Sequence, residues 1–254
     1  MQSLLAVLYR EYKLRTSNHL VMVFYDLCLP MCYLLVFGSG LAGVTQNRVV
    51  WEGAQLPYVS FFLAGVLAMT SFGIAMGAAW GFFTDRDNGI FYEFLTYPMR
   101  RGEFLLGKIL FNSLISVGRA GLTVLAAVVV LHVQVRAGMI PLLLLTVVTG
   151  TVGWFFFMAV FALRIRRNDA FYTLMDLFYF FLLFASSAFY PLDPMPAWLR
   201  RLSLVNPLTW QTDLLRYASL GVGDGHRLAG EAVAFGGFTL ICFWVAAREL
   251  ARKD

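Results

Sequence analysis

Six long apolar stretches run along the chain, separated by short polar segments. They cover residues 20–41, 58–83, 109–131, 139–163, 170–190 and 228–247. A helix of about 20 mostly apolar residues crosses the hydrocarbon of a bilayer, where only helices and closed barrels satisfy their backbone hydrogen bonds. The pattern therefore predicts an all-α integral membrane protein with six transmembrane helices, folded as a single transmembrane domain over residues 1–254.

Two further segments predict helices that do not span the membrane. Residues 1–19 place leucines and a tyrosine at helical spacing, which predicts an amphipathic interface helix on the cytoplasmic membrane surface. Residues 191–227 mix apolar, basic and proline residues. They predict one or two short helices that lie in the outer interface or dip into it, with Trp198 and Trp210 as interfacial anchors.

The polar segment 84–108 separates the second and third predicted spans. Its sequence is TDRDNGIFYEFLTYPMRRGEFLLGK. Asp87 or Asn88 is predicted to cap a short helix over residues 89–96, and Pro98 is predicted to end it, because proline lacks the backbone N–H that a helix needs. Such a helix suits docking into a groove of a soluble partner. The alternative is an ordinary surface loop.

Residues 102–109, GEFLLGKI, nearly match the phosphate-binding motif G-x-x-x-x-G-K-[ST]. Ile109 stands where the motif has the hydroxyl that binds magnesium, and the motif needs a preceding strand. A transmembrane helix is predicted here instead. We therefore expect that this chain binds no nucleotide and no other cofactor, and that Lys108 anchors the third span at the lipid headgroups.

The distribution of basic residues predicts the orientation in the membrane. If the N-terminus is cytoplasmic, 13 of the 20 Lys and Arg residues lie in inner segments and six in outer segments. Basic residues collect in cytoplasmic loops, so both termini are predicted to be cytoplasmic. The same bias explains the net charge of +5 without a nucleic-acid partner. The three histidines have no metal-ligand spacing, and the three cysteines lie in apolar segments, so neither a metal site nor a disulfide is expected.

Some predicted spans carry charged residues, which are costly in a bilayer and usually face a bundle interior or a cavity. The charged residues are Asp26, Arg119 and Asp176. Polar residues on the same helical faces are Asn112, Ser116 and Tyr172. One interpretation is that these faces line a transport pathway. The other is that Arg119 pairs with Asp26 or Asp176 and holds the bundle together.

Two stretches carry a family resemblance. DRDNGIFYEFLTYPMRRGEFLLGKIL resembles the cytoplasmic loop of ABC-2-type transporter permeases, and SSAFYPLDPMPAWLRRLSLVNPLTWQTDLLRY is similar to the outer segment after their fifth span. The resemblance implies the permease subunit of an ABC exporter in a bacterial plasma membrane. Two copies, as a homodimer, would form the pathway for a lipid, a lipid-linked glycan or an amphipathic drug. Two separate ABC ATPase subunits would bind ATP and magnesium.

The resemblance also implies which residues contact the ATPase. They are Gly89, Glu93, Pro98, Arg100 and Arg101 in the coupling segment, and Arg10, Glu11 and Lys13 on the interface helix. An ion-coupled secondary transporter and a membrane assembly factor without transport are the alternatives. An intramembrane enzyme would need a constellation such as H-E-x-x-H or G-x-S-x-G, and the sequence has neither.

Overall fold

The structure is a computed structural model of the chain, which describes residues 2–16, 19–44, 48–97, 99 and 101–252. Within these ranges some side chains are left undescribed, and that of Asp26 is among them. In chain order the helices are α1 Gln2–Thr16, α2 His19–Val44, α3 Tyr58–Asp87, α4 Ile90–Leu95, α5 Arg101–Leu131, α6 Ile140–Arg164, α7 Asn168–Phe184, α8 Ala197–Leu204, α9 Pro207–Leu220 and α10 Gly225–Ala251. A short 3₁₀ helix, η1 (Ala137–Met139), precedes α6, and the strands β1 (Arg48–Trp51) and β2 (Ala54–Pro57) lie between α2 and α3.

Four helices in the described part of the chain are long and apolar enough to cross a membrane. They are α3, α5, α6 with its 3₁₀ start, and α10. The first and fifth predicted spans correspond to α2, which has 26 residues, and to α7, which has 17. The chain is therefore an integral membrane protein. The count of six spans stays a prediction.

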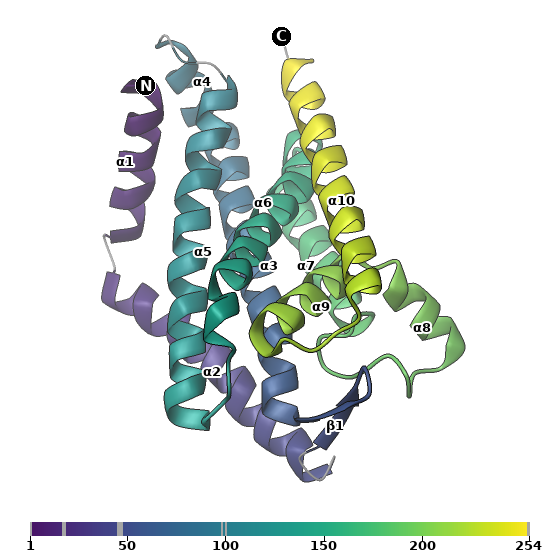
Figure 1. Cartoon of the computed structure of the whole chain (residues 1–254). Helices are drawn as coiled ribbons and strands as arrows, with labels where there is room; N and C mark the ends of the chain where they lie inside the picture. Colours follow the sequence, from purple (N-terminus) through teal and green to yellow (C-terminus); the bar gives the residue numbers. More distant parts are fainter. Residues whose placement is uncertain (1, 17–18, 45–47, 98, 100, 253–254) are drawn as a thin grey trace.

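The helices form an elongated bundle with two different ends. Both termini and α4 lie at one end, here called the termini end, and β1 and β2 lie at the other, the hairpin end (Figure 1). The segment predicted as an interface helix is α1, which packs along α5 near the termini end. Gly107 permits this contact, because a Cβ there would lie 2.7 Å from Cγ1 of Val7. The location of α1 relative to a bilayer surface stays a prediction.

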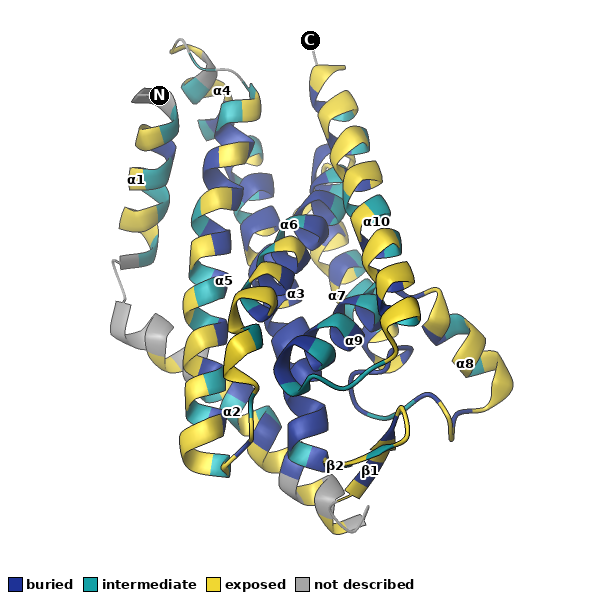
Figure 2. Ribbon diagram, in the orientation of Figure 1, coloured by how far each residue is buried: buried dark blue, intermediate teal, exposed yellow. Residues whose placement is uncertain are grey.

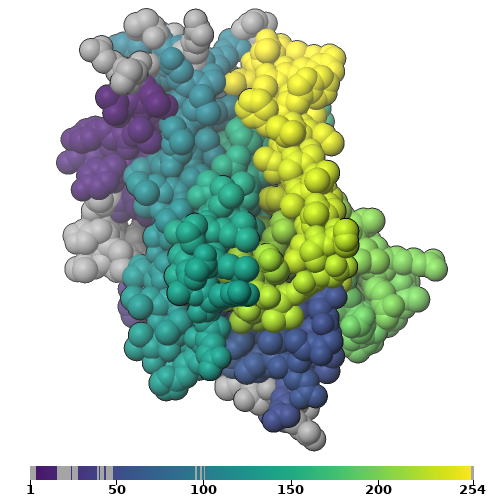
Figure 3. Space-filling view, viewed as in Figure 1, coloured from purple at the N-terminus to yellow at the C-terminus, as the bar shows by residue number. Residues whose placement is uncertain are grey.

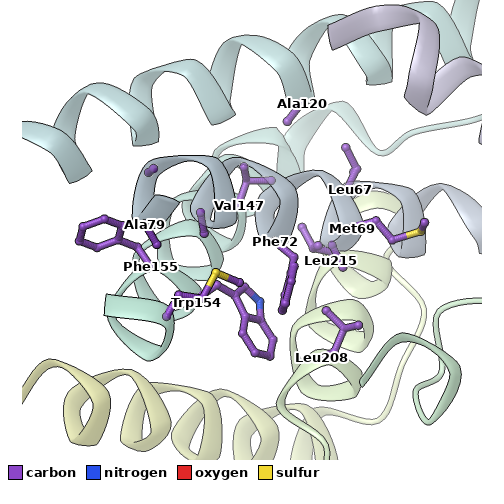
Figure 4. Packing of buried hydrophobic residues seen from close by; sticks show 14 of the residues in the cluster. Leu67, Met69, Phe72, Ala79, Ala120, Val147, Trp154, Phe155, Leu208 and Leu215 are labelled. Carbon is purple, nitrogen blue, oxygen red and sulfur yellow. The ribbon is translucent and has the colours of Figure 1, made fainter. Parts of the chain in front are cut away.

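The helix α3 forms the centre of the bundle and is buried along most of its length (Figure 2). It packs against α2, α5, α6 and α9. Phe72 of α3 and Trp154 of α6 meet with ring centroids 4.8 Å apart (Figure 4). Trp154 also donates a 2.6 Å hydrogen bond to Gln211 of α9. A Cβ at Gly150 would overlap Nε2 of Gln211, so this close approach of α9 requires a glycine.

The hairpin formed by β1 and β2 was missed by the all-α prediction. Its strands pair antiparallel, with Arg48 opposite Pro57 and Trp51 opposite Ala54. Glu52 and Gly53 make the turn with φ values of 47° and 77°. Two-residue hairpin turns need such positive φ angles, which match the twist of the strands. A single glycine, Gly53, marks this turn in the sequence, so the pattern of apolar residues does not predict the hairpin.

The fifth predicted span ends earlier than expected, because α7 stops at Phe184 and residues 185–190 form a buried turn. Ser186 donates a 2.7 Å hydrogen bond to the carbonyl of Leu183. A Cβ at Gly65 of α3 would lie less than 2.5 Å from the carbonyl oxygen of Ala188, so the turn lies directly on the α3 backbone. These contacts stop the helix although its sequence remains largely apolar.

The segment predicted to hold outer interfacial helices forms α8 and α9. The helix α8 is exposed and carries Trp198, whereas α9 packs between α3, α6 and α10. Asn206 begins α9, since its side chain accepts a hydrogen bond from the N–H of Leu208 and donates to the carbonyls of Leu182 and Ala185. The helix α9 is therefore part of the bundle, and the position of α8 and α9 relative to the outer interface stays a prediction.

Candidate functional site

The short helix α4 occupies the predicted coupling segment, but it begins differently from the prediction. Gly89 precedes it with φ of 79°, and no side chain caps the helix. The predicted cap by Asp87 or Asn88 is therefore wrong. Asn88 instead closes α3, with its N–H donating to the carbonyl of Thr84. The left-handed conformation, which glycine adopts at little cost, lets the chain turn from α3 into α4.

One aromatic side chain fixes α4 against the bundle. Phe91 is buried, with its ring centroid 5.7 Å from that of Phe82 on α3 and 5.3 Å from that of Phe104 on α5. Glu93 and Tyr92 are exposed on the same short helix. Tyr92 and Glu93 of α4 are therefore exposed at the termini end, while Phe91 packs against the bundle.

The rest of the predicted coupling segment is described only in part. Pro98 and Arg100 lie outside the described residues. Arg101 donates a 2.9 Å hydrogen bond to the carbonyl of Leu250, which joins the start of α5 to the last turn of α10. Cations near the carbonyl end of a helix are favourable. Arg101 therefore has a structural contact that its prediction as a coupling residue did not include.

Four charged residues form an ion-pair quartet at the termini end, namely Arg10, Glu11, Asp85 and Lys108. Lys108 Nζ lies 2.7 Å from Glu11 Oε1 and 2.8 Å from Asp85 Oδ2. Arg10 forms two hydrogen bonds to the Asp85 carboxylate, of 2.5 and 3.0 Å, and lies 3.3 Å from Glu11. The quartet joins α1, α3 and α5, and its formal charges cancel.

The quartet corrects two expectations about individual residues. The side chain of Lys108 is only 2% exposed, so it is not positioned as a headgroup anchor. Arg10 and Glu11 point toward α3 and α5, whereas Lys13 is exposed on α1. A buried ammonium is costly unless charges pair with it, and two carboxylates meet that need here. In the sequence, the signal for this burial of Lys108 was Asp85, an acidic residue 23 positions earlier.

A cavity of about 950 Å³ begins at the quartet and extends along the bundle. Glu11 and Lys108 form part of its wall, and its other lining residues come from α1, α2, α3, α5 and α7. Most of the lining is aromatic or aliphatic. Gly73 and Gly77 of α3 also face it, and a Cβ at either would meet no atom within 4 Å. The space-filling view shows the outer surface of the chain around this bundle (Figure 3).

The cavity brings together four of the predicted pathway residues. They are Asn112, Arg119, Tyr172 and Asp176. Ser116 is fully buried instead and donates a 2.7 Å hydrogen bond to the carbonyl of Ser113. In the described part of the chain, no ion pair joins Arg119 to Asp176. Because the Asp26 side chain lies outside the described residues, its pairing with Arg119 stays a prediction.

An aromatic cluster lies between the cavity and the hairpin end. The ring of Phe189, in the turn after α7, stacks on Phe62 at 5.3 Å and on Phe184 at 5.9 Å, and meets Phe37 edge-on at 5.4 Å. The Tyr58 hydroxyl donates a 2.7 Å hydrogen bond to the carbonyl of Phe189. The cluster therefore fixes the turn over three helices.

The helical phenylalanines of this cluster lie directly beyond the cavity. Each is four residues, or about one turn, further toward the hairpin end than a cavity-lining residue of its own helix. Those lining residues are Tyr33 on α2, Val66 on α3 and Phe180 on α7. The cluster thus lies next to the cavity on the side of the hairpin end.

A second charged network lies beyond the cluster, where sequence reasoning placed only outer basic residues. Arg216 of α9 is fully buried and lies 2.7 Å from Asp213, with its guanidinium over the rings of Trp51 and Phe61. Arg227 also pairs with Asp213, at 2.7 Å. Burial lowers the pKa of Arg216 to about 10, so it remains charged at neutral pH. The i,i+3 spacing of Asp213 and Arg216 was the sequence signal.

The chain matches a known protein family over most of its length. The family model described as ABC-2 type transporter matches residues 2–220, from α1 through α9. The chain belongs to the ABC-2 type transporter family. This match covers α4, the quartet and the cavity, so the family resemblance seen in two short stretches extends over most of the chain.

This ABC-2 family member is also similar to individual proteins, each named "Putative transport permease ycf38". It is 24% identical to the one from Cyanophora paradoxa over 217 residues, which are 84% of this chain and 73% of the relative. The relatives from Porphyra purpurea and Pyropia yezoensis are 23% and 24% identical, over 74% of this chain and 64% of each relative. Together with the family, these relatives support a transmembrane transport permease.

Proposed function

We propose that this ABC-2 permease is the transmembrane subunit of an ABC exporter. Two copies, as a homodimer, form the substrate pathway, and two separate ATPase subunits bind ATP and magnesium and drive it. The observation that carries this proposal is the arrangement at the termini end, where an exposed short helix, α4, lies beside an ion-pair quartet at the start of a large cavity.

The proposed ATPase contact is α4 together with the exposed side of α1. Phe91 packs α4 against α3 and α5, so a displacement of α4 would be passed directly to these two long helices. Glu93 is exposed there, and Lys13 is exposed on α1. Paired charges across an interface steer docking and fix its register. Glu93 is therefore the first coupling residue to test.

The cavity supports an amphipathic substrate. Its volume of about 950 Å³ is at the upper end of what drug-sized ligand sites have, about 300–1,000 Å³. Rings such as those of Phe72, Trp80 and Tyr179 favour an apolar body, and Arg119 and Asp176 offer charges. We propose a lipid, a lipid-linked glycan or an amphipathic drug-like molecule, exported from the cytoplasm or the inner leaflet.

The proposed orientation places the termini end in the cytoplasm. Both termini lie at this end, as does α4, and the basic residues of the inner segments support the assignment. The aromatic cluster then closes the cavity toward the outside. A bacterial plasma membrane is the proposed location.

The proposal is tested with Glu93→Ala in the permease, co-purified with its ATPase and reconstituted in vesicles. We expect ATP hydrolysis to continue while ATP-driven transport falls at least tenfold, because the docking contact no longer passes motion to α3 and α5. Asp193→Ala, which removes an exposed carboxylate at the hairpin end, is the matched control and should transport normally. Unchanged coupling in a folded Glu93→Ala complex would contradict this role of α4.

The same vesicles separate the alternatives. A secondary transporter would move substrate under an ion gradient without ATP, because its driving force is the ion. A membrane assembly factor would move no substrate under either condition. Transport that requires both ATP and the ATPase subunit is the result expected here.

A further inference from the structure

Lys108 belongs to three parts of the molecule at once. Its side chain lines the cavity, forms ion pairs with α1 and α3, and projects from α5. In the same helix, one turn earlier, Phe104 packs against Phe91 of α4. The cavity wall and the proposed ATPase contact therefore meet at one side chain and its neighbours.

A continuous series of contacts leads from the cavity to α4. Lys108 contacts Glu11 and Asp85, and Asp85 is held by Arg10 through two hydrogen bonds. The guanidinium of Arg10 lies 5.9 Å from the ring centroid of Phe94 on α4. Each contact joins a different pair of elements, so α1, α3, α4 and α5 are all connected through the quartet.

Separating the buried charges of the quartet is costly, so we expect its four side chains to move together. Two cations and two carboxylates lie in a largely buried site, where removing one partner leaves an uncompensated charge. A displacement of α1 that moves Glu11 would therefore move Lys108 with it, because separating the two charges is costly. Because Lys108 is part of the cavity wall, such a displacement would also change the cavity.

We propose that Lys108 is the positioning residue that couples the cavity to the ATPase-docking helices α1 and α4. The inference rests on the proposed function, because it assumes that an ATPase docks at the termini end. Nucleotide binding in that partner would shift α1 and α4, and the quartet would carry the shift to the cavity wall.

The test measures how nucleotide changes the accessibility of the cavity. Met76, which lines the cavity, is replaced by cysteine in a background without native cysteines, and its rate of modification by a small maleimide is followed with and without ATP and magnesium. In the parent complex we expect a change of about fivefold or more, a typical size for allosteric coupling. Lys108→Met should abolish this change while the ATPase still co-purifies. Lys108→Arg, which keeps the charge, should retain it.

Two further variants keep the test decisive. Lys108→Met with Asp85→Asn removes one charge of each sign, so it tests coupling even if the single variant fails to fold. Arg164→Met breaks an exposed ion pair with Glu249 at the same end and should leave the nucleotide response intact. A full response in the assembled double variant would overturn the role of Lys108. A parent complex that binds no ATPase would instead count against the proposed function.

Discussion

Replacing Arg216 by methionine removes the most buried cation of the hairpin-end network. Its guanidinium pairs with Asp213 at 2.7 Å and donates to the carbonyl of Ser187 at 2.9 Å. It also lies 4.4 Å from the ring centroid of Trp51 and 3.8 Å from that of Phe61. Methionine fills a similar volume but leaves the carboxylate of Asp213 with fewer donors in a buried site.

The expected cost follows from this arrangement. Breaking a buried ion pair by removing one partner costs about 3–5 kcal/mol. For a chain of about this size, each kcal/mol lowers Tm by about 2–4 °C. Arg216→Met should therefore lower Tm by about 6–20 °C. Asp213 retains Ser187 and Arg227 as partners, which favours the lower part of that range.

The assay is thermal unfolding of the purified protein in one detergent, followed by tryptophan fluorescence. Arg201→Met, an exposed arginine of α8, is the matched control and should leave Tm unchanged within about 1 °C. Asp213→Asn added to Arg216→Met should recover part of the loss, because it removes the buried carboxylate charge that has lost its closest buried cation. A single variant as stable as the parent, or a double variant no better than the single, would refute this reasoning.

Two further predictions concern the aromatic cluster and helix packing. With a cysteine introduced at Met69 in the cavity, Phe189→Ala should let a membrane-impermeant thiol reagent, applied from the hairpin side, modify that cysteine at least several-fold faster. Phe181→Ala, which lies outside the cluster, should not change this rate. Equal rates in the two variants would mean that the cluster does not close the cavity. Gly150→Ala should destabilise the protein by about 1–3 kcal/mol, because the added methyl overlaps the buried glutamine of α9. In the same unfolding assay Gly73→Ala, which faces open space, should be neutral, and equal Tm values for the two variants would contradict this packing.

The long helices could be predicted from the sequence because a bilayer imposes a length and an apolar composition on each span. The position of α4 was also predictable, since a proline follows a short mixed segment, although the predicted cap by Asp87 or Asn88 does not form. The orientation of Arg10 and Glu11 could not be predicted from the sequence. The pairing of α1 with α5 that buries them depends on a contact between Gly107 and Val7, which are far apart in the sequence.

The charged networks show a second reason why the sequence alone did not predict where these charged side chains lie. Lys108 lies just before an apolar run and has the spacing of a headgroup anchor, yet two carboxylates from other helices allow it to be buried. Arg216 likewise depends on Trp51, which belongs to a hairpin that the apolar pattern did not reveal. Periodicity identifies the elements, but partners from distant elements decide where a charge can lie.

The docking of an ATPase on α4 at the termini end underlies the proposed function. Hydrogen–deuterium exchange of the permease, measured with and without the ATPase subunit, tests it most directly. We expect the amides of residues 90–95 to exchange more slowly in the complex, while those of the hairpin at residues 48–57 are unchanged. Protection of the hairpin with none at α4 would contradict it.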